Sequence, residues 1–237
     1  MNHAKQYLTP RCTPKNLDSY LIRAGIVAAL KESLPIFSGT FLDVGCGFKP
    51  YRPLILSPAT NVDKYIGLDL QENLYGTPDL TWDGRTIPLD DHTVDSAMAT
   101  ELLEHCPDPQ AVLAEIFRVL KPGGSCFLTV PFLWPLHEVP HDYFRYTPHG
   151  LETLLRKVGF SAVNITPLGG WDAALAQVLG LWVSRRAIPG TLRPVLQVLL
   201  WPLYCLLIHF DKRPEVFRAD TLFPGLAVTA GKPDSIR

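Results

Sequence analysis

The short segment from Phe41 to Phe48 constrains the fold of this 237-residue chain more than any other part of the sequence. It reads FLDVGCGF, an apolar run that ends in an acid and is followed by two glycines. A continuous apolar run is typical of a parallel strand that is buried on both faces. Gly45 and Gly47 allow a tight turn in which a ligand can approach main-chain N–H groups. The sequence therefore predicts a buried strand with Asp43 near its carboxyl end, followed by a ligand-binding turn.

Strand-like and helical segments alternate along most of the chain. The expected strands are at 40–44, 65–69, 79–82, 94–99, 125–131 and 160–165, with a final one at 225–230. The expected helices are at 17–34, 110–120 and 148–158. This alternation implies an α/β fold with a mainly parallel sheet and right-handed crossovers.

Composition and charge narrow the classes of partner. The formal net charge is −1, so the chain lacks the basic balance of a polyanion-binding protein, and nucleic acid is not expected as a partner. The five cysteines are scattered and form no C-x-x-C, which argues against a disulfide framework and a zinc knuckle. The N-terminus lacks the apolar core of a secretory signal. We therefore expect a cytoplasmic protein.

The glycine turn alone allows more than one ligand. In doubly wound sheets, ligands bind outside the carboxyl ends of the strands. Asp69 ends the second expected strand, where an acid commonly accepts hydrogen bonds from a ribose diol. The dinucleotide fingerprint needs a third glycine at position 50, and Pro50 stands there instead. An adenosine-type cofactor is expected, with NAD as a disfavoured candidate.

An ordered set of short motifs resembles the class I S-adenosylmethionine-dependent methyltransferases, in particular the small-molecule branch called the type 11 domain. The resemblance spans roughly residues 38–166. Its matching segments are Asp43–Gly47, Gly67–Asp69, Trp82–Gly84, Ile87–Leu89, Val94–Asp95, Glu101–His105 and Arg118–Gly124. The resemblance implies a Rossmann-like, seven-stranded, mainly parallel sheet with helices on both faces and an antiparallel last strand. It also implies S-adenosyl-L-methionine as cofactor.

The resemblance assigns a role to each motif around the cofactor. The Gly45–Gly47 turn would pass beneath the methionine part, and Asp43 would face its amino group. Asp69 would hold the ribose hydroxyls, and Asp83 would lie near the adenine amino group. The implied cofactor-binding positions are Asp43, Gly45, Cys46, Gly47, Asp69, Leu70, Asp83, Gly84, Thr100 and Glu101.

The charge of these positions favours one cofactor over the other. Thr100 and Glu101 would line the floor of the site near the sulfonium. A sulfonium and an ammonium are attracted by carboxylates, whereas a pyrophosphate is repelled by them. The acids therefore favour S-adenosylmethionine over NAD.

Two loops at the expected carboxyl edge of the sheet hold the candidate catalytic groups. The longer loop, 131–146, follows the fifth strand, and His141 is its best candidate for a general base, with Asp142 or Tyr143 as partner. The alternative is that these residues only hydrogen-bond the loop together. His105, after the fourth strand, is a second catalytic candidate or a cap on the wall beside the cofactor.

The segment from His137 to His141 also matches H-E-x-x-H, a zinc-protease signature. That chemistry needs both histidines on one face of a regular helix. Pro140 lies between them and Pro135 lies just upstream, and proline disfavours a helix interior by about 3 kcal/mol. No metal site is therefore expected.

Residues 171–213 interrupt the alternation with two apolar runs, 173–183 and 195–210. Basic residues flank them, namely Arg185, Arg186, Arg193, Lys212 and Arg213. The second run has 16 residues and contains Pro202, so a membrane span is not expected. Two interpretations remain: a cap or homodimer interface, or in-plane helices that rest on a bilayer and place the protein peripherally at the inner membrane face.

The expected organisation has four parts: an N-terminal arm and helix at 1–37, a cofactor-binding core at 38–170, an apolar helical insertion at 171–216, and a final strand and tail at 217–237. Residues 1–16 are expected to form a loose arm. The expected function is methyl transfer to a small or lipid-linked acceptor, preferably at oxygen. The alternatives are a non-catalytic adenosyl-ligand-binding or membrane-recruited partner protein, and an NAD-dependent oxidoreductase.

Overall fold

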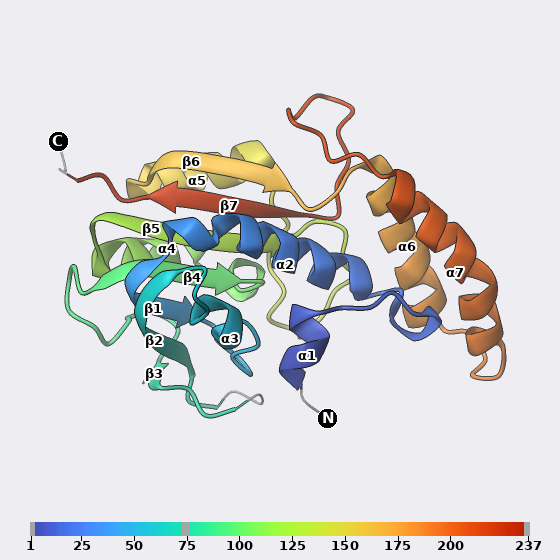
Figure 1. The fold of residues 1–237 in the computed structure, drawn as a ribbon, viewed down its shortest axis with the longest axis horizontal. Coiled ribbons are helices and arrows are strands. Elements are labelled where there is room, and N and C mark those ends of the chain that lie inside the picture. The colour runs from blue at the N-terminus through green and yellow to red at the C-terminus, as the bar shows by residue number, and fades with distance from the viewer. Residues whose placement is uncertain (1–2, 73–75, 235–237) are drawn as a thin grey trace.

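A seven-stranded sheet forms the centre of the computed structural model, which describes residues 3–72 and 76–234 (Figure 1). Its strands are β1 (Ser38–Val44), β2 (Asn61–Leu70), β3 (Leu80–Trp82), β4 (Val94–Thr100), β5 (Leu120–Pro131), β6 (Ser161–Pro167) and β7 (Gly225–Gly231). They lie in the order β3-β2-β1-β4-β5-β7-β6. β7 runs antiparallel to β5 and β6, and the other pairs are parallel. The predicted α/β architecture with an antiparallel last strand is confirmed.

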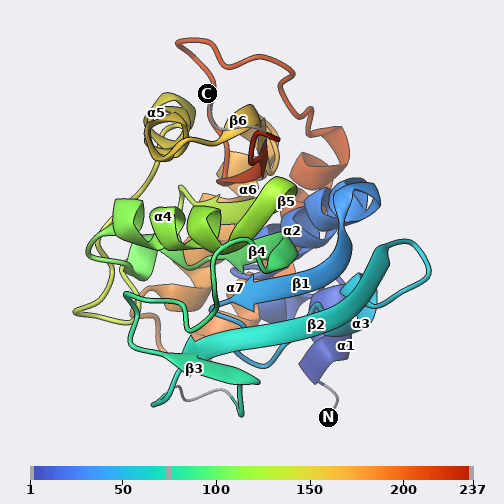
Figure 2. The ribbon, with the colours of Figure 1, turned by 90° about the vertical axis from the view of Figure 1, so that its left-hand side faces the viewer.

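Helices cover both faces of this sheet. They are α1 (His3–Leu8), α2 (Tyr20–Ser33), α3 (Arg52–Ile55), α4 (Pro109–Val119), α5 (Pro148–Val158), α6 (Trp171–Arg185) and α7 (Leu192–Phe210), with 3₁₀ turns η1 (Pro14–Asn16), η2 (Leu34–Ile36) and η3 (Leu103–His105). Figure 2 shows α4 and α5 on one face and α2 and α3 on the other. Asp108 caps α4 by accepting a hydrogen bond from the Ala111 N–H at 3.1 Å.

β1 is buried on both faces, as its apolar run predicts. Phe41 is fully buried in the core under α2 and α3, where its ring packs edge-on against Phe37 at 5.0 Å. Leu42 points to the opposite core, under α4 and α5. Because successive side chains of a strand alternate between faces, Asp43 returns to the side of Phe41 and is itself buried.

The N-terminal segment is more ordered than the sequence indicated. Tyr7, in α1, packs edge-on against Tyr51 with 6.2 Å between ring centroids, and the Arg23 guanidinium lies 4.7 Å from the Tyr7 ring. Leu17, just past η1, is fully buried. The expectation of a loose arm is therefore wrong for residues 3–8 and 14–16, which are helical because their apolar neighbours bury against the domain. Residues 1–2 lie outside the described residues.

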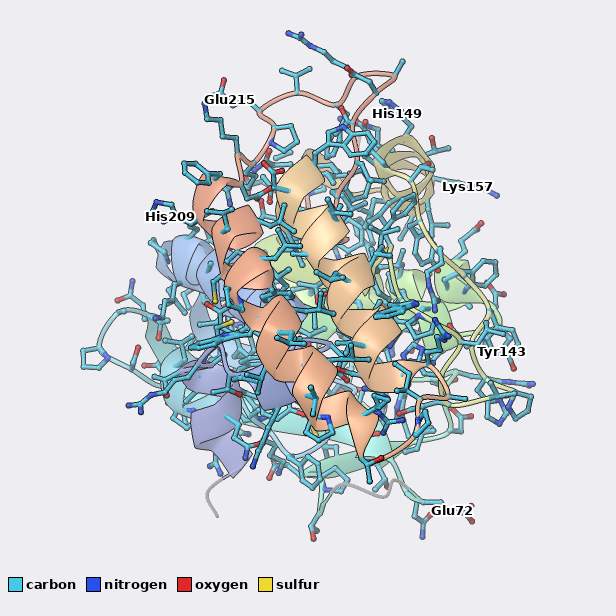
Figure 3. The ribbon with its side chains drawn as sticks, turned by 90° about the vertical axis from the view of Figure 1, so that its right-hand side faces the viewer. Glu72, Tyr143, His149, Lys157, His209 and Glu215 are labelled. Carbon is cyan, nitrogen blue, oxygen red and sulfur yellow. The ribbon has the colours of Figure 1, made fainter. Side chains whose placement is uncertain are left out.

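Helices α6 and α7 pair beside each other beyond the carboxyl ends of the parallel strands (Figures 1 and 3). Tyr204, in α7, is fully buried between this pair and Leu17. α7 has 19 residues and continues through Pro202, so it is longer than the 16-residue run expected from sequence. The difference arises because Leu192, Arg193 and Pro194 form an additional first turn, a position that suits proline.

Among the described residues, α7 is the one helix whose length and apolar composition could cross a membrane, with a mean hydropathy of 1.4. Only 6% of that window is buried, so most of α7 faces outward.

Candidate active site

The glycine turn joins β1 to the carboxyl end of β2. The N–H groups of Gly45 and Cys46 both donate to the Leu68 carbonyl, at 2.8 and 3.1 Å. Gly45 has φ +72°, and a Cβ at this position would lie 2.8 Å from Leu102 Cδ1. The backbone conformation therefore favours glycine here, and a Cβ would also require the Leu102 side chain to shift.

A pocket of about 330 Å³ opens over this turn at the carboxyl edge of the sheet. Its walls come from the turn, the end of β4, α1, α2, the loop after β5 and the end of α6. The lining residues are Tyr7, Ser19, Ile22, Arg23, Ile26, Gly45, Cys46, Gly47, Phe48, Pro50, Tyr51, Thr100, Glu101, Trp134, His137, Glu138 and Arg185. A larger hollow of about 840 Å³ lies beside residues 210–222, away from the turn. The expected positions at the turn and at Thr100 and Glu101 thus share one pocket.

Asp69 is tied directly to the glycine turn. Its Oδ2 accepts the Gly47 N–H at 2.8 Å, and its Oδ1 accepts the Leu70 N–H at 2.8 Å. Each carboxylate oxygen has two acceptor directions, so these bonds leave capacity for hydroxyl donors. The acid at the end of β2 therefore lies where a ligand crossing from the turn would meet it.

Asp83 and Gly84 lie further along the same edge, beyond β2. The exposed Asp83 carboxylate accepts the N–H groups of Arg85 and Thr86 at 2.8 Å each, and these bonds lower the pKa of Asp83. A Cβ at Gly84 would lie 3.5 Å from Leu70 Cδ2, so Leu70 and Gly84 are neighbours. Leu70, Asp83 and Gly84 thus gather beside Asp69 but outside the pocket.

Asp43 is buried within the sheet and does not line the pocket. Tyr65 donates its hydroxyl to Oδ2 of Asp43, while Oδ1 has no hydrogen-bond partner among the described residues. Burial raises the pKa of Asp43 to about 7, and the Tyr65 hydrogen bond opposes this rise. A buried carboxyl of this kind ionises readily only when a cation lies nearby.

Glu101 is one of two acids, with Glu138, among the lining residues of the pocket. It follows β4 with φ +51°, an uncommon conformation for a side chain with a Cβ. Thr129 donates its hydroxyl to Glu101 Oε1 at 2.9 Å, and the Glu101 N–H donates to the Thr129 carbonyl at 3.0 Å. Burial raises the pKa of Glu101 to about 7. The neighbouring strand thus holds Glu101 in its uncommon backbone conformation.

Asp142 organises the loop after β5. The Arg145 guanidinium donates two hydrogen bonds to its carboxylate, at 2.6 and 2.8 Å. The backbone N–H and the ring Nδ1 of His137 lie 3.1 and 3.3 Å from the same carboxylate. The Arg145 hydrogen bond holds the pKa of Asp142 well below its usual range. Asp142 therefore shapes the loop through Arg145 and His137.

His141 and Tyr143 lie on the outer side of this loop. His141 is exposed and its Nδ1 lies 3.2 Å from the Tyr143 hydroxyl. Tyr143 is 44% exposed and projects at the periphery in Figure 3. The two are brought together as a pair, but neither lines the pocket, whereas His137 does.

His105 faces the same loop from η3. Its Nδ1 lies 2.7 Å from the His141 carbonyl, and its ring packs edge-on against His137 at 4.6 Å. Beside it, Glu104 is fully buried. The segment from His137 to His141 contains no helix, so the two histidines of the H-E-x-x-H pattern do not share a helical face.

Comparison with known proteins places this geometry in a family. Residues 42–128 match the family described as "Methyltransferase domain". That range contains the glycine turn, Asp69, Asp83 and Glu101. Residues 42–128 therefore belong to a methyltransferase domain.

Two relatives are similar in sequence to parts of this chain. An uncharacterised 37.1 kDa protein of transposon TN4556 from Streptomyces fradiae is 29% identical over 77% of the chain, which covers 60% of that protein. A malonyl-[acyl-carrier protein] O-methyltransferase from Alcanivorax borkumensis is 31% identical over 52% of the chain and 46% of its own length. The chain therefore spans about half to three fifths of these relatives.

Among solved structures, phosphoethanolamine N-methyltransferase 2 of Haemonchus contortus in complex with S-adenosyl-L-methionine superposes with a TM-score of 0.55. It is 15% identical and covers 98% of this chain and 60% of its own. At this identity the likeness concerns the fold alone.

The sequence did not indicate that the N-terminal helices would line this pocket with Tyr7 and Arg23, or the end of α6 with Arg185. The loop after β5 was expected at the site, but its pocket-lining residues Trp134 and His137 were not singled out. The one local signal was the pair Tyr7 and Leu8, apolar residues within an otherwise polar arm. Their convergence depends on contacts between distant parts of the chain.

Proposed function

We propose that this protein transfers a methyl group from S-adenosyl-L-methionine to a small or lipid-linked acceptor, at an oxygen atom. The observation that carries the proposal is that the Gly45–Gly47 turn and the partly buried Glu101 line one pocket. NAD-dependent oxidation is disfavoured because Pro50 stands where the dinucleotide fingerprint needs a third glycine, and because the carboxyl groups of Asp69 and Glu101 lie beside the turn that a pyrophosphate would approach.

The residues present fit this cofactor in three ways. The turn has no Cβ at Gly45 or Gly47, both with positive φ, so a ligand can lie close to its main chain. Asp69 lies beside Gly47 with acceptor capacity for ribose hydroxyls. Oδ1 of Asp43 is buried without a hydrogen-bond partner among the described residues, and a nearby ammonium would favour its ionised form.

S-adenosylmethionine, when bound, supplies a methyl group on a positively charged sulfur. The task of this chain is then to align the acceptor and exclude water. Glu101 would offset the positive charge. With a pKa near 7 it is also suited to take a proton from an acceptor hydroxyl. At the outer rim of the pocket, the acceptor is proposed to contact His105 and the pair formed by His141 and Tyr143. Asp142 holds the loop after β5 in position.

Calorimetric titration with S-adenosylmethionine, S-adenosylhomocysteine and NAD tests the cofactor. We expect saturable heat with the first two, and weaker binding by Glu101→Gln. Heat with NAD alone would replace the proposal with an oxidoreductase. Binding of both adenosyl compounds without methyl transfer to any hydroxylated acceptor, tested with a labelled methyl group, would favour a non-catalytic binding protein.

The outer face of the α6–α7 pair supports a hydrophobic or lipid-linked acceptor. Its large apolar side chains are substantially exposed, namely Leu175, Val178, Trp182, Val195, Val198, Leu199, Leu203, Leu206 and Phe210. Arg186 and Arg193 flank one end of the pair, and Lys212 and Arg213 flank the other. An apolar face with tryptophan and flanking arginines is typical of helices that lie in a membrane interface.

Flotation with anionic vesicles tests this contact. We expect the wild-type protein to float and the double variant Leu199→Glu/Leu206→Glu to remain at the bottom. Leu136→Glu is the control, because Leu136 is 77% exposed on a loop outside the pair. A wild-type protein that stays at the bottom and forms a dimer by light scattering would instead assign this face to a second copy.

A further inference from the structure

Three side chains with metal-binding atoms converge beside the pocket. Glu104 and His105 come from η3, and His137 comes from the loop after β5. One carboxylate oxygen and one ring nitrogen from each histidine lie within 4.8 Å of one another. Neither sequence spacing nor the proposed methyl transfer accounts for this grouping.

Glu104 is the least explained member of this group. It is fully buried, and neither of its carboxylate oxygens has a hydrogen-bond partner among the described residues. Nε2 of His105 lies 3.7 Å from Oε1 of Glu104, which is too far for a hydrogen bond. Burying a carboxylate without a partner is costly, and a bound cation is one of the few groups that offsets this cost.

The two histidine rings are held in an orientation suited to metal binding. Nδ1 of His105 lies 2.7 Å from the His141 carbonyl, which can only accept, so Nδ1 carries the proton. Nδ1 of His137 lies 3.3 Å from the Asp142 carboxylate, which forms an ion pair with Arg145. Both contacts leave Nε2 as the unprotonated nitrogen, and such outer contacts are usual for metal-ligating histidines.

We propose that Glu104, His105 and His137 bind one divalent transition-metal ion of the Zn²⁺ type. Two imidazoles and one carboxylate suit Zn²⁺ and its neighbours, whereas Mg²⁺ and Ca²⁺ prefer oxygen ligands alone. In a tetrahedral site with bonds of about 2.1 Å, ligand atoms lie about 3.4 Å apart. The pair Glu104–His105 is already close to this value at 3.7 Å, and metal binding would shorten the other separations, of up to 4.8 Å, by rotation of the side chains.

The site has a position for a further ligand. Three protein ligands leave the fourth tetrahedral position open, as in catalytic zinc sites. His137 also lines the pocket over the glycine turn, so the open position lies next to bound small molecules.

Metal titration of the chelator-treated, full-length protein tests the proposal without any assay of methyl transfer. We expect one Zn²⁺ per chain by calorimetry, and visible absorption bands on adding Co²⁺ in its place. Glu104→Gln, His105→Ala and His137→Ala should each weaken Zn²⁺ binding at least about tenfold. Zn²⁺ should raise the melting temperature of the wild-type protein and not that of Glu104→Gln.

His149→Ala is the matched control, because His149 is exposed on α5 and should leave Zn²⁺ affinity unchanged. Melting curves in chelator show that each variant is folded before titration, and Glu104→Gln keeps the size of the side chain where the alanine variants do not. Absence of stoichiometric binding to the wild-type protein would overturn the proposal. A Zn²⁺ affinity of Glu104→Gln equal to that of the wild type would also overturn the proposal. Glu104 would then be a protonated acid beside His105 that binds no metal. Because S-adenosylmethionine is absent from this experiment, its failure leaves the proposed function standing.

Discussion

Asp43 should make the protein less stable as the pH rises from about 4 to about 7. Burial raises the pKa of Asp43 to about 7 in the folded state, against an ordinary value of 3.8. Between these values the unfolded chain releases the proton while the folded protein keeps it. Stability falls with pH wherever the unfolded state binds fewer protons. The contribution is therefore fully present below pH 3.8 and is lost by about pH 7.

The size of the effect follows from the same two values. One proton of difference changes the free energy of unfolding by about 1.4 kcal/mol per pH unit. Across the roughly three pH units that separate the two pKa values, Asp43 accounts for up to about 4 kcal/mol. The substitution Asp43→Asn cannot ionise and keeps an oxygen that accepts the Tyr65 hydroxyl. The free energy of unfolding of Asp43→Asn should therefore fall less steeply with pH than that of the wild type. The two slopes should differ by about 1.4 kcal/mol per pH unit.

Urea unfolding of the wild type and Asp43→Asn at pH 5.0, 5.5, 6.0 and 6.5 measures this difference. Glu101 also has a raised pKa, but it is present in both proteins and cancels in the comparison. Asp63→Asn, at an exposed position of β2, should run parallel to the wild type. If Asp43→Asn also runs parallel to the wild type, the carboxyl is already ionised at pH 5 and the argument from its burial is refuted.

Three further predictions follow from other contacts. The wild-type dissociation constant for S-adenosylmethionine should fall roughly tenfold between pH 5.5 and 7 by calorimetry as the buried acids ionise, with a smaller fall in Glu101→Gln. Gly45→Ala should lower stability by about 1–2 kcal/mol and weaken cofactor binding, whereas Gly190→Ala, with open space around its Cα, should do neither. Lys232→Met should lower the free energy of unfolding, measured in urea, by about 2–3 kcal/mol, because the buried ammonium donates to the carbonyls of Phe117 and Leu120 at 2.6 and 2.7 Å. The control Lys157→Met, at an exposed position, should lower it by under about 0.5 kcal/mol.

The cofactor side of the domain could be predicted from sequence because its signals are local. A run such as Phe41–Val44 reports burial on both faces without knowledge of its neighbours. The glycines that follow report a turn, and parallel strands place their carboxyl ends at one edge. Asp69 could therefore be assigned to that edge from its place at a strand end, whereas the role of Glu101 came from the family resemblance. The antiparallel position of β7 came from the resemblance alone, since a single strand's pattern carries no pairing direction.

The acceptor side could not be predicted in the same way, because its geometry depends on distant contacts. In the loop after β5, the sequence favours His141 over His137 as the candidate general base. The structure separates them because Arg145 fixes Asp142, and Asp142 in turn contacts His137. His141 is left outside with Tyr143. Ion-pair geometry of this kind has no signature in residue spacing.

The α6–α7 pair connects the pocket with the exposed apolar surface. Arg185, the last residue of α6, lines the pocket and is held by Asp18 at 2.7 Å, with its guanidinium 5.8 Å from the Trp134 ring. The same helix presents Val178 and Trp182 outward. An acceptor with an apolar tail could therefore keep the tail on this surface while its polar end reaches the pocket. A small, fully polar acceptor would gain nothing from the exposed face, whose apolar area is costly to leave in water. The exposure of α7 is thus a physical reason to screen lipid-linked acceptors first.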